Sequence, residues 1–130
     1  MSKGEEKIIG ILQKSKYEFE REKSFSDLKQ GKYRFDFYVY RGRTIPCIIE
    51  YNGEGHYQYI SKFYRTRTDF ESAKERDRRK ISYCLAHNIP LYVIPYWKLD
   101  DIYTADDLFQ PHFRAVNRWK NDLDWKNKKI

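Results

Sequence analysis

The chain has 130 residues, enough for one domain built around one hydrophobic core. Its 26 lysines and arginines against 19 acidic residues give a net charge of +7, a modest sign of a polyanionic partner that an ordinary basic protein would also show. No stretch reaches the roughly 20 apolar residues of a membrane span, the N-terminal apolar run is too short for a signal peptide, and neither Cys47 nor Cys84 belongs to a CxxC pair. We therefore expect a soluble, cytoplasmic protein with two buried, reduced cysteines.

The spacing of apolar residues predicts a helix over residues 4–15, strands over 17–22, 33–40 and 44–51, a long helix over 69–87, a strand over 90–96 and short helices after it. The second strand alternates, which should place Phe35, Phe37 and Val39 on one face. A tight turn at 41–43 makes an antiparallel hairpin, whereas the long helix is a natural crossover between parallel strands. The expected fold is α/β (α+β), a mixed central β-sheet flanked by helices, in a single domain over 1–130 whose residues 97–130 form a helical, basic extension.

Two of the predicted strands carry an acidic residue where sheet interiors disfavour charge. Asp36 lies inside the alternating strand, and Glu50 lies at the end of the next strand. A carboxylate in a sheet interior costs free energy unless it is paired or holds a metal ion. Neighbouring strands would bring these two carboxylates together, so they are the first candidates for a metal site.

Each of the two predicted long helices also directs one carboxylate towards the sheet. At 100° per residue, Asp77 falls in the middle of the apolar stripe of the long helix, and Lys80 falls at the edge of that stripe. Glu5 lies within the apolar stripe of the first helix. Each acid has a structural alternative, because Glu5 suits the positive end of a helix dipole and Asp77 could pair with a buried Arg34 or with Lys80.

Four inward-facing carboxylates would repel one another unless a cation offset their charge. Magnesium prefers carboxylate oxygens, and manganese is expected to substitute for it. The predicted metal ligands are Asp36, Glu50 and the carbonyl of Tyr51. His56 follows across a glycine-rich turn, and its imidazole suits proton transfer or the positioning of a water molecule near neutral pH.

The connection after His56 interleaves aromatic and basic side chains. This composition suits contact with phosphates together with stacking on bases, although a surface loop without a binding role can share it. The predicted DNA contacts are Tyr57, Lys62, Tyr64, Arg65 and Arg67.

In chain order, Glu5, Asp36, His56 and Asp77 resemble the Glu-Asp-His-Asp pattern of the PD-(D/E)xK nuclease superfamily, in the branch that contains very-short-patch repair and phage homing endonucleases. The resemblance covers residues 2–96. It implies a restriction-endonuclease-like fold and magnesium-dependent cleavage of double-stranded DNA. It also implies an origin in a phage or mobile element, and hence a location in the cytoplasm of a bacterial host.

One position departs from the superfamily pattern. The usual lysine lies two residues after the strand glutamate, where this chain has Asn52. Lys80 or His56 would then take the role of that lysine, and the ease with which imidazole exchanges a proton favours His56. Three alternatives stay open: a nuclease that resolves Holliday junctions or nicks mismatched DNA, an RNA nuclease, and a non-catalytic DNA-binding protein that keeps the fold.

Overall fold

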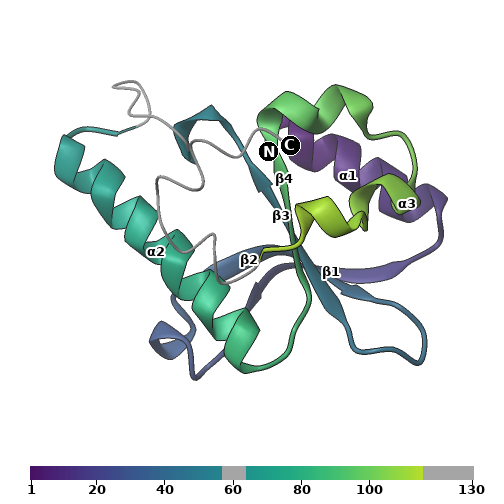
Figure 1. Ribbon diagram of the computed structural model, residues 1–130, viewed down its shortest axis with the longest axis horizontal. Helices are drawn as coiled ribbons and strands as arrows, with labels where there is room; N and C mark the ends of the chain where they lie inside the picture. The colour runs from purple at the N-terminus through teal and green to yellow at the C-terminus, as the bar shows by residue number, and fades with distance from the viewer. Residues whose placement is uncertain (57–63, 116–130) are drawn as a thin grey trace.

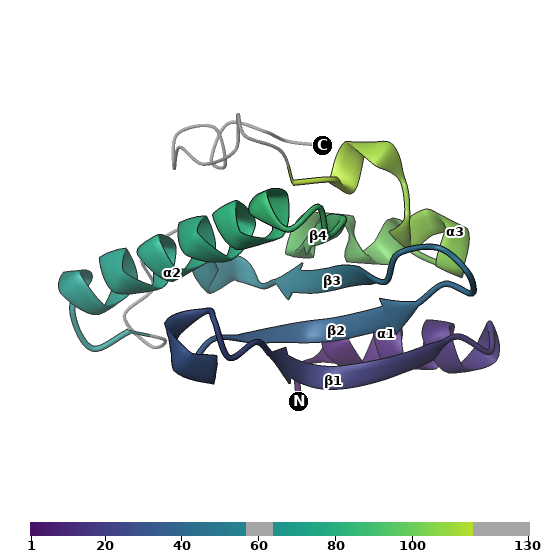
Figure 2. The same ribbon diagram turned by 90° about the horizontal axis from the view of Figure 1, so that it is seen from below.

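A four-stranded mixed sheet forms the centre of the computed structural model, which describes residues 1–56 and 64–115, without the side chain of His56. The elements follow in the order α1 (Lys3–Lys14), β1 (Glu18–Ser24), β2 (Arg34–Tyr40), β3 (Cys47–Asn52), α2 (Arg67–Ala86), β4 (Leu91–Pro95) and α3 (Ala105–Leu108). The strands lie in the order β1-β2-β3-β4; the first two pairs are antiparallel, and β3 and β4 are parallel. The predicted mixed sheet with flanking helices is confirmed, and so is the crossover through α2 (Figures 1 and 2).

Local polar contacts fix the ends of the two long helices. Ser2 caps α1, because its side-chain oxygen accepts a hydrogen bond from the backbone N–H of Glu5 at 3.1 Å. Thr66 caps α2 in the same way through the backbone N–H of Asp69. After α2, Asn88 takes the left-handed backbone conformation that closes many helices, with φ of 55°.

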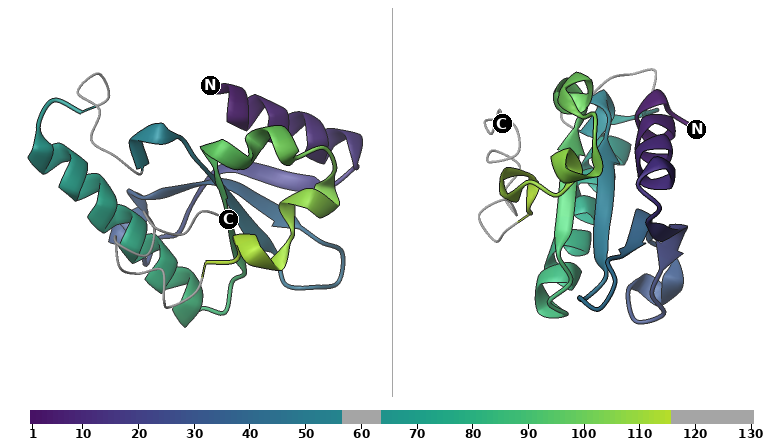
Figure 3. Two further views of the ribbon diagram at one scale, coloured as in Figure 1. Left: turned by 45° about the horizontal axis from the view of Figure 1, so that its top comes forward. Right: turned by 90° about the vertical axis from the view of Figure 1, so that its right-hand side faces the viewer.

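The two long helices cover opposite faces of the sheet (Figures 1 and 3). One core cluster joins α1 and the short α3 to the sheet through Ile8, Leu12, Leu108, Phe37, Val39 and Ile49. The other joins α2 to the sheet through Ile81, Cys84, Phe35, Ile48 and Val93. Because Ile48 and Ile49 are neighbours on one strand, the two clusters lie on opposite sides of it. Cys47 and Cys84 are buried free thiols, as expected.

The alternation of side chains between the two faces of the sheet is interrupted in β1 and β2 at one pair of opposing residues, Glu22 and Asp36. The strand register passes over these two residues without pairing them, and Glu22 has φ of 56°, which is uncommon for a residue with a side chain. As a consequence Phe35 packs on the α2 side, whereas Phe37 and Val39 pack on the α1 side. The prediction that all three share a face is therefore wrong, because strict alternation assumes a regular strand.

The connection between β2 and β3 is longer than predicted. Six residues, 41–46, join the two strands in place of a tight turn at 41–43. Pro46 stands before β3 and has no N–H to donate to the ladder, which delays the start of the strand. Gly42 takes a positive φ of 67° within the connection.

Short helical segments follow β4, as predicted, and the last of them ends at Phe113. They return the chain to the edge of β4, where the backbone N–H of Ala115 donates to the carbonyl of Leu91 at 2.9 Å. The rest of the predicted basic extension lies outside the described residues. In the described part of the chain, no helix combines the length and the apolar character needed to cross a membrane.

Candidate active site

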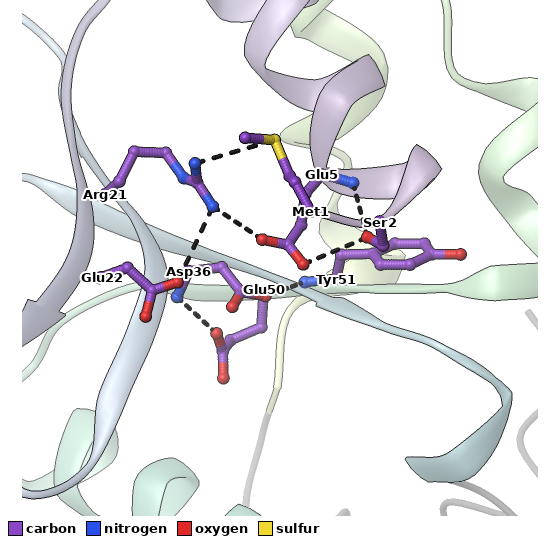
Figure 4. Close-up of polar contacts among 8 residues, drawn as sticks. All are labelled: Met1, Ser2, Glu5, Arg21, Glu22, Asp36, Glu50 and Tyr51. Carbon is purple, nitrogen blue, oxygen red and sulfur yellow. Dashed lines mark hydrogen bonds and ion pairs between the residues drawn. The ribbon is translucent and has the colours of Figure 1, made fainter. Parts of the chain in front are cut away.

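The backbone pairing of β2 with β3 ends at Phe37 and Ile49, and side chains replace it at the next position. The backbone N–H of Asp36 donates to Oε2 of Glu50 at 2.7 Å, and the backbone N–H of Tyr51 donates to Oδ2 of Asp36 at 2.8 Å. Each carboxylate thus does what a backbone carbonyl does elsewhere in the ladder. This exchange brings Asp36 and Glu50 together at the end of the strand pairing (Figure 4).

α2 brings Lys80 to the other oxygen of Glu50. Nζ of Lys80 lies 2.5 Å from Oε1 of Glu50, and the two side chains are only 10% and 9% exposed. Burial by itself lowers the pKa of a lysine, but the charges of Glu50, Asp36 and Asp77 outweigh it and raise the pKa of Lys80 above its ordinary value. Lys80 is therefore a buried cation at neutral pH.

The surplus of negative charge in this group affects the pKa of Asp36. Burial and the neighbouring Glu50 carboxylate raise the pKa of Asp36 to about 8, while the Tyr51 N–H and the charge of Lys80 oppose the rise. At neutral pH the carboxyl group of Asp36 is therefore mostly protonated unless a further cation approaches it. Strongly raised carboxyl pKa values of this kind cluster at functional sites.

A glycine lets α1 approach the end of β3 and bring Glu5 to the same region. A Cβ atom on Gly4 would lie 2.3 Å from the ring of Tyr51, so a larger residue would displace the helix or the ring. Glu5 is partly exposed, at 23%. Ile8 and Leu12 are buried beneath it, which confirms the inward face that the sequence predicts for this helix.

β1 supplies two residues that the sequence analysis does not name, Arg21 and Glu22. Carboxylate oxygens of Glu5, Glu22 and Asp36 lie within 4.8 Å of one another, close enough to share one metal ion. Nη2 of Arg21 lies 2.7 Å from Oε2 of Glu5 and 3.8 Å from Oε1 of Glu22 (Figure 4). Finding these residues from the sequence would have required the register of β1 on β2, which places Glu22 opposite Asp36.

Asp77 and Asn52 line a small cavity of about 10 Å³ beside Lys80. The remaining lining residues are Glu50, Ile81, Leu91 and Val93. Asp77 is buried, as the helical wheel predicts, and Asn52 is 5% exposed. Arg34 is exposed at the start of β2, so the alternative in which Asp77 pairs with a buried Arg34 does not hold.

Three of the predicted site residues fall wholly or partly outside the described structure. The backbone of His56 ends a short 3-10 turn over Glu54–His56, but its side chain is not described. Tyr57 and Lys62 lie outside the described residues. Their predicted roles stay predictions.

The other three predicted DNA contacts lie just before and at the start of α2. The Tyr64 hydroxyl donates to the carbonyl of Gly55 at 3.2 Å, so this side chain holds the two ends of the connection together. Arg65 and Arg67 are exposed. Nε of Arg67 lies 3.7 Å from Glu71 one turn along the helix, an exposed ion pair that a phosphate could replace.

Among curated proteins, the chain is similar to two proteins of viruses. It is 29% identical over 68 residues to the uncharacterized protein 307L of Invertebrate iridescent virus 6, covering 52% of this chain and 34% of that protein. It is 36% identical over 55 residues to the uncharacterized protein 094L of Frog virus 3, covering 42% of this chain and 36% of that protein. The chain thus spans about a third of the length of these relatives. No family model and no solved structure matches it.

Proposed function

We propose that this protein is a metal-dependent endonuclease that hydrolyses DNA phosphodiester bonds at the site formed by Asp36, Glu50 and Lys80. The observation that carries the proposal is the convergence of these side chains. Two carboxylates are held together at the end of the β2–β3 pairing, and a buried lysine lies 2.5 Å from one of them. Such a set suits phosphoryl transfer, in which catalysis consists largely of positioning and of stabilising negative charge.

Lys80 takes the role that the superfamily pattern gives to a lysine at the position of Asn52. Its raised pKa keeps the ammonium group charged, so that it can stabilise the negative charge that develops on the phosphate. Glu50 fixes the position of that ammonium group through the 2.5 Å contact. This proposal gives Lys80 the role for which the sequence alone favours His56.

The acidic residues of the site fit a divalent cation such as Mg²⁺ or Mn²⁺. The raised pKa of Asp36 reflects a surplus of negative charge that a cation would relieve. Asp36 would hold the cation together with Glu5 and Glu22, whose oxygens lie within 4.8 Å of one another and of Asp36. This set replaces Glu50 and the Tyr51 carbonyl, the other two ligands expected from the sequence, because both oxygens of Glu50 already contact Lys80 and the Asp36 N–H. A bound cation would polarise the phosphate and make a water molecule more acidic.

DNA is the proposed substrate because the chain is basic and exposes two arginines at the start of the helix that carries Lys80. The net charge is +7, and Arg65 and Arg67 flank the start of the helix that carries Lys80. Cations in this arrangement bind phosphates without reading the base sequence. Comparing the cleavage products of duplex, mismatched and four-way-junction DNA and of RNA would identify which nucleic acid the protein cleaves.

Cleavage of supercoiled plasmid tests the proposal directly. The protein should nick or linearise plasmid with Mg²⁺ or Mn²⁺ and leave it intact in EDTA. Asp36→Ala should abolish cleavage while a gel shift shows that DNA binding persists. Asp100→Ala, at an exposed acid after β4, is the matched control and should cleave normally. Full activity of the metal-free protein in EDTA would contradict the mechanism, and binding without cleavage by the natural protein would favour a non-catalytic DNA-binding role.

Single-turnover cleavage at saturating enzyme separates Lys80 from His56. Lys80→Ala should lower the rate by about 100- to 1,000-fold, the usual effect of removing one group that stabilises transition-state charge. His56→Ala should have a smaller effect. A nearly normal rate for Lys80→Ala, beside an inactive His56→Ala, would reverse the assignment.

A further inference from the structure

We infer that Arg21 is the resident counter-ion of the acidic group formed by Glu5, Glu22 and Asp36, and that a divalent cation binds there by displacing the Arg21 guanidinium. The inference rests on the function proposed above. The guanidinium lies 2.7 Å from Glu5 and 3.8 Å from Glu22. It also lies over the ring of Phe37, 5.1 Å from the ring centre. Figure 4 shows it between α1 and the strands, next to the carboxylates that a cation would use.

The change of face in β1 is what brings Arg21 and Glu22 to one place. In a regular strand these two neighbours would point to opposite faces of the sheet. Here the left-handed backbone of Glu22, with φ of 56°, turns its carboxylate to the side of Glu5, which Arg21 already contacts. The strand therefore supplies an additional acid to the group and, in the preceding residue, the cation that neutralises it.

The ion pair of Arg21 is more exposed to solvent than that of Lys80, the other cation of the site. The pair of Arg21 with Glu5 is partly exposed, at 29% and 23%, whereas the Lys80–Glu50 pair is 10% and 9% exposed. Partly exposed ion pairs contribute little to stability because water competes for both charges. In addition, Nε of Arg21 is buried and has no hydrogen-bond partner in the described part of the chain. Arg21 thus neutralises the group through an ion pair that water reaches more easily than it reaches the pair of Lys80 and Glu50.

Competition for the same carboxylates favours exchange over coexistence. Arg21 lies 2.7 Å from Oε2 of Glu5 and 3.8 Å from Glu22, two of the three acids whose oxygens a cation would use. A divalent cation among these oxygens would attract the carboxylates and repel the guanidinium at the same time. Movement of Arg21 towards solvent relieves that repulsion and leaves the oxygens of Glu5 to the cation.

Calorimetric titration of the full chain with Mn²⁺, without nucleic acid, tests the inference. Arg21→Gln should bind Mn²⁺ about tenfold more tightly than the natural protein, as expected when one unit charge no longer opposes a divalent ion. Lys23→Gln is the matched control, because it makes the same charge change two residues along the same strand. The Lys23 side chain is 27% exposed and pairs with Glu20 rather than with the acidic group. Its Mn²⁺ affinity should change by less than about twofold.

Thermal melting gives a second, independent measurement. In EDTA, Arg21→Gln should melt below the natural protein, because the carboxylates lose their counter-ion, and saturating Mn²⁺ should remove the difference. Equal or weaker Mn²⁺ binding by Arg21→Gln would overturn the inference. If Asp36→Ala still abolishes Mn²⁺ binding in that case, the proposed metal site stands and only the role of Arg21 fails. If the natural protein binds no Mn²⁺ at all, both fail.

Discussion

Lys80 and Glu50 join helix α2 to strand β3 inside the site: Nζ and Oε1 lie 2.5 Å apart, across 30 residues of sequence. Both side chains are about nine-tenths buried, so removing either one leaves an uncompensated charge in the protein interior. The pair therefore contributes to the folded state and also holds the ammonium group in place. Effects on stability and on activity at these two residues will be linked.

Replacing Lys80 with methionine should lower the free energy of unfolding by about 3 to 5 kcal/mol, because the Glu50 carboxylate stays buried without a partner. Urea denaturation measures this loss. Adding Glu50→Gln should recover part of it, since a neutral pair needs no counter-charge. Arg79→Met changes the next residue, whose side chain is 47% exposed, and should cost less than about 0.5 kcal/mol. Equal losses for Lys80→Met and Arg79→Met would show that the buried pair contributes no more than a surface pair.

The pH dependence of stability should reveal the perturbed carboxyl group of Asp36. The pKa of Asp36 is about 8 in the folded chain against an ordinary 3.8, so between these values the folded state keeps a proton that the unfolded state has lost. In EDTA, this group therefore makes stability fall as pH rises from about 4 to about 8. Asp36→Asn cannot ionise, so its unfolding free energy should fall less over this range than that of the natural protein.

The control for this experiment is Glu6→Gln, because Glu6 is an exposed acid one residue after Glu5 on the same helix. Its pH dependence should parallel that of the natural protein. Parallel curves for Asp36→Asn as well would mean that the carboxyl group of Asp36 titrates normally in the fold.

The glycines of α1 allow a paired test of the close approach to Tyr51. Gly4→Ala would place a Cβ atom 2.3 Å from the tyrosine ring, and the forced shift should cost about 1 to 3 kcal/mol. Gly10→Ala, on the same helix, meets nothing within 4 Å and should stabilise the protein by about 0.5 to 1 kcal/mol. Urea denaturation of both variants checks the opposite signs, and equal signs would show that α1 does not rest on Tyr51.

Arg65 and Arg67 should contact phosphates rather than bases. Replacing both with alanine should weaken DNA affinity similarly for different sequences. The slope of log affinity against log salt should also decrease, by up to about 0.9 per lost contact on duplex DNA. Arg43→Ala is the control, because Arg43 is exposed in the connection at the other end of β2 and β3. An unchanged salt slope for the double variant would place this segment off the DNA.

The order of the elements and the inward faces of the helices could be predicted from the sequence, because both depend on the periodicity of apolar residues. Asp77 among apolar neighbours in α2 and Glu5 above Ile8 are examples, and the helical wheel places them correctly. Asp36 and Glu50 could be expected near one another because they lie on consecutive antiparallel strands, but their exact register depends on the six-residue connection that the sequence did not predict.

The residues that the sequence analysis missed depend on irregular backbone or on long-range register. The φ of 56° at Glu22 has no signal in the amino-acid types around it, yet it brings the Glu22 carboxylate close to those of Glu5 and Asp36. Lys74 is 2% exposed although a lysine in a helix normally suits solvent. Arg21 belongs to the site because α1 and β1 lie side by side, which brings it to Glu5, a residue 16 positions away in the sequence.

The backbone at Glu22 also bears on how this position can evolve. A left-handed conformation costs a residue with a side chain roughly 1 to 2 kcal/mol. Glycine does not have this cost, and asparagine adopts the conformation more readily than most other residues. Selection for resistance to proteolysis alone, applied to a library randomised at this position, should therefore enrich glycine or asparagine. Selection for a working acidic group should restore glutamate or aspartate. The two selections would diverge at this residue, because a substitution that makes the protein more resistant to proteolysis would also remove one carboxylate from the acidic group.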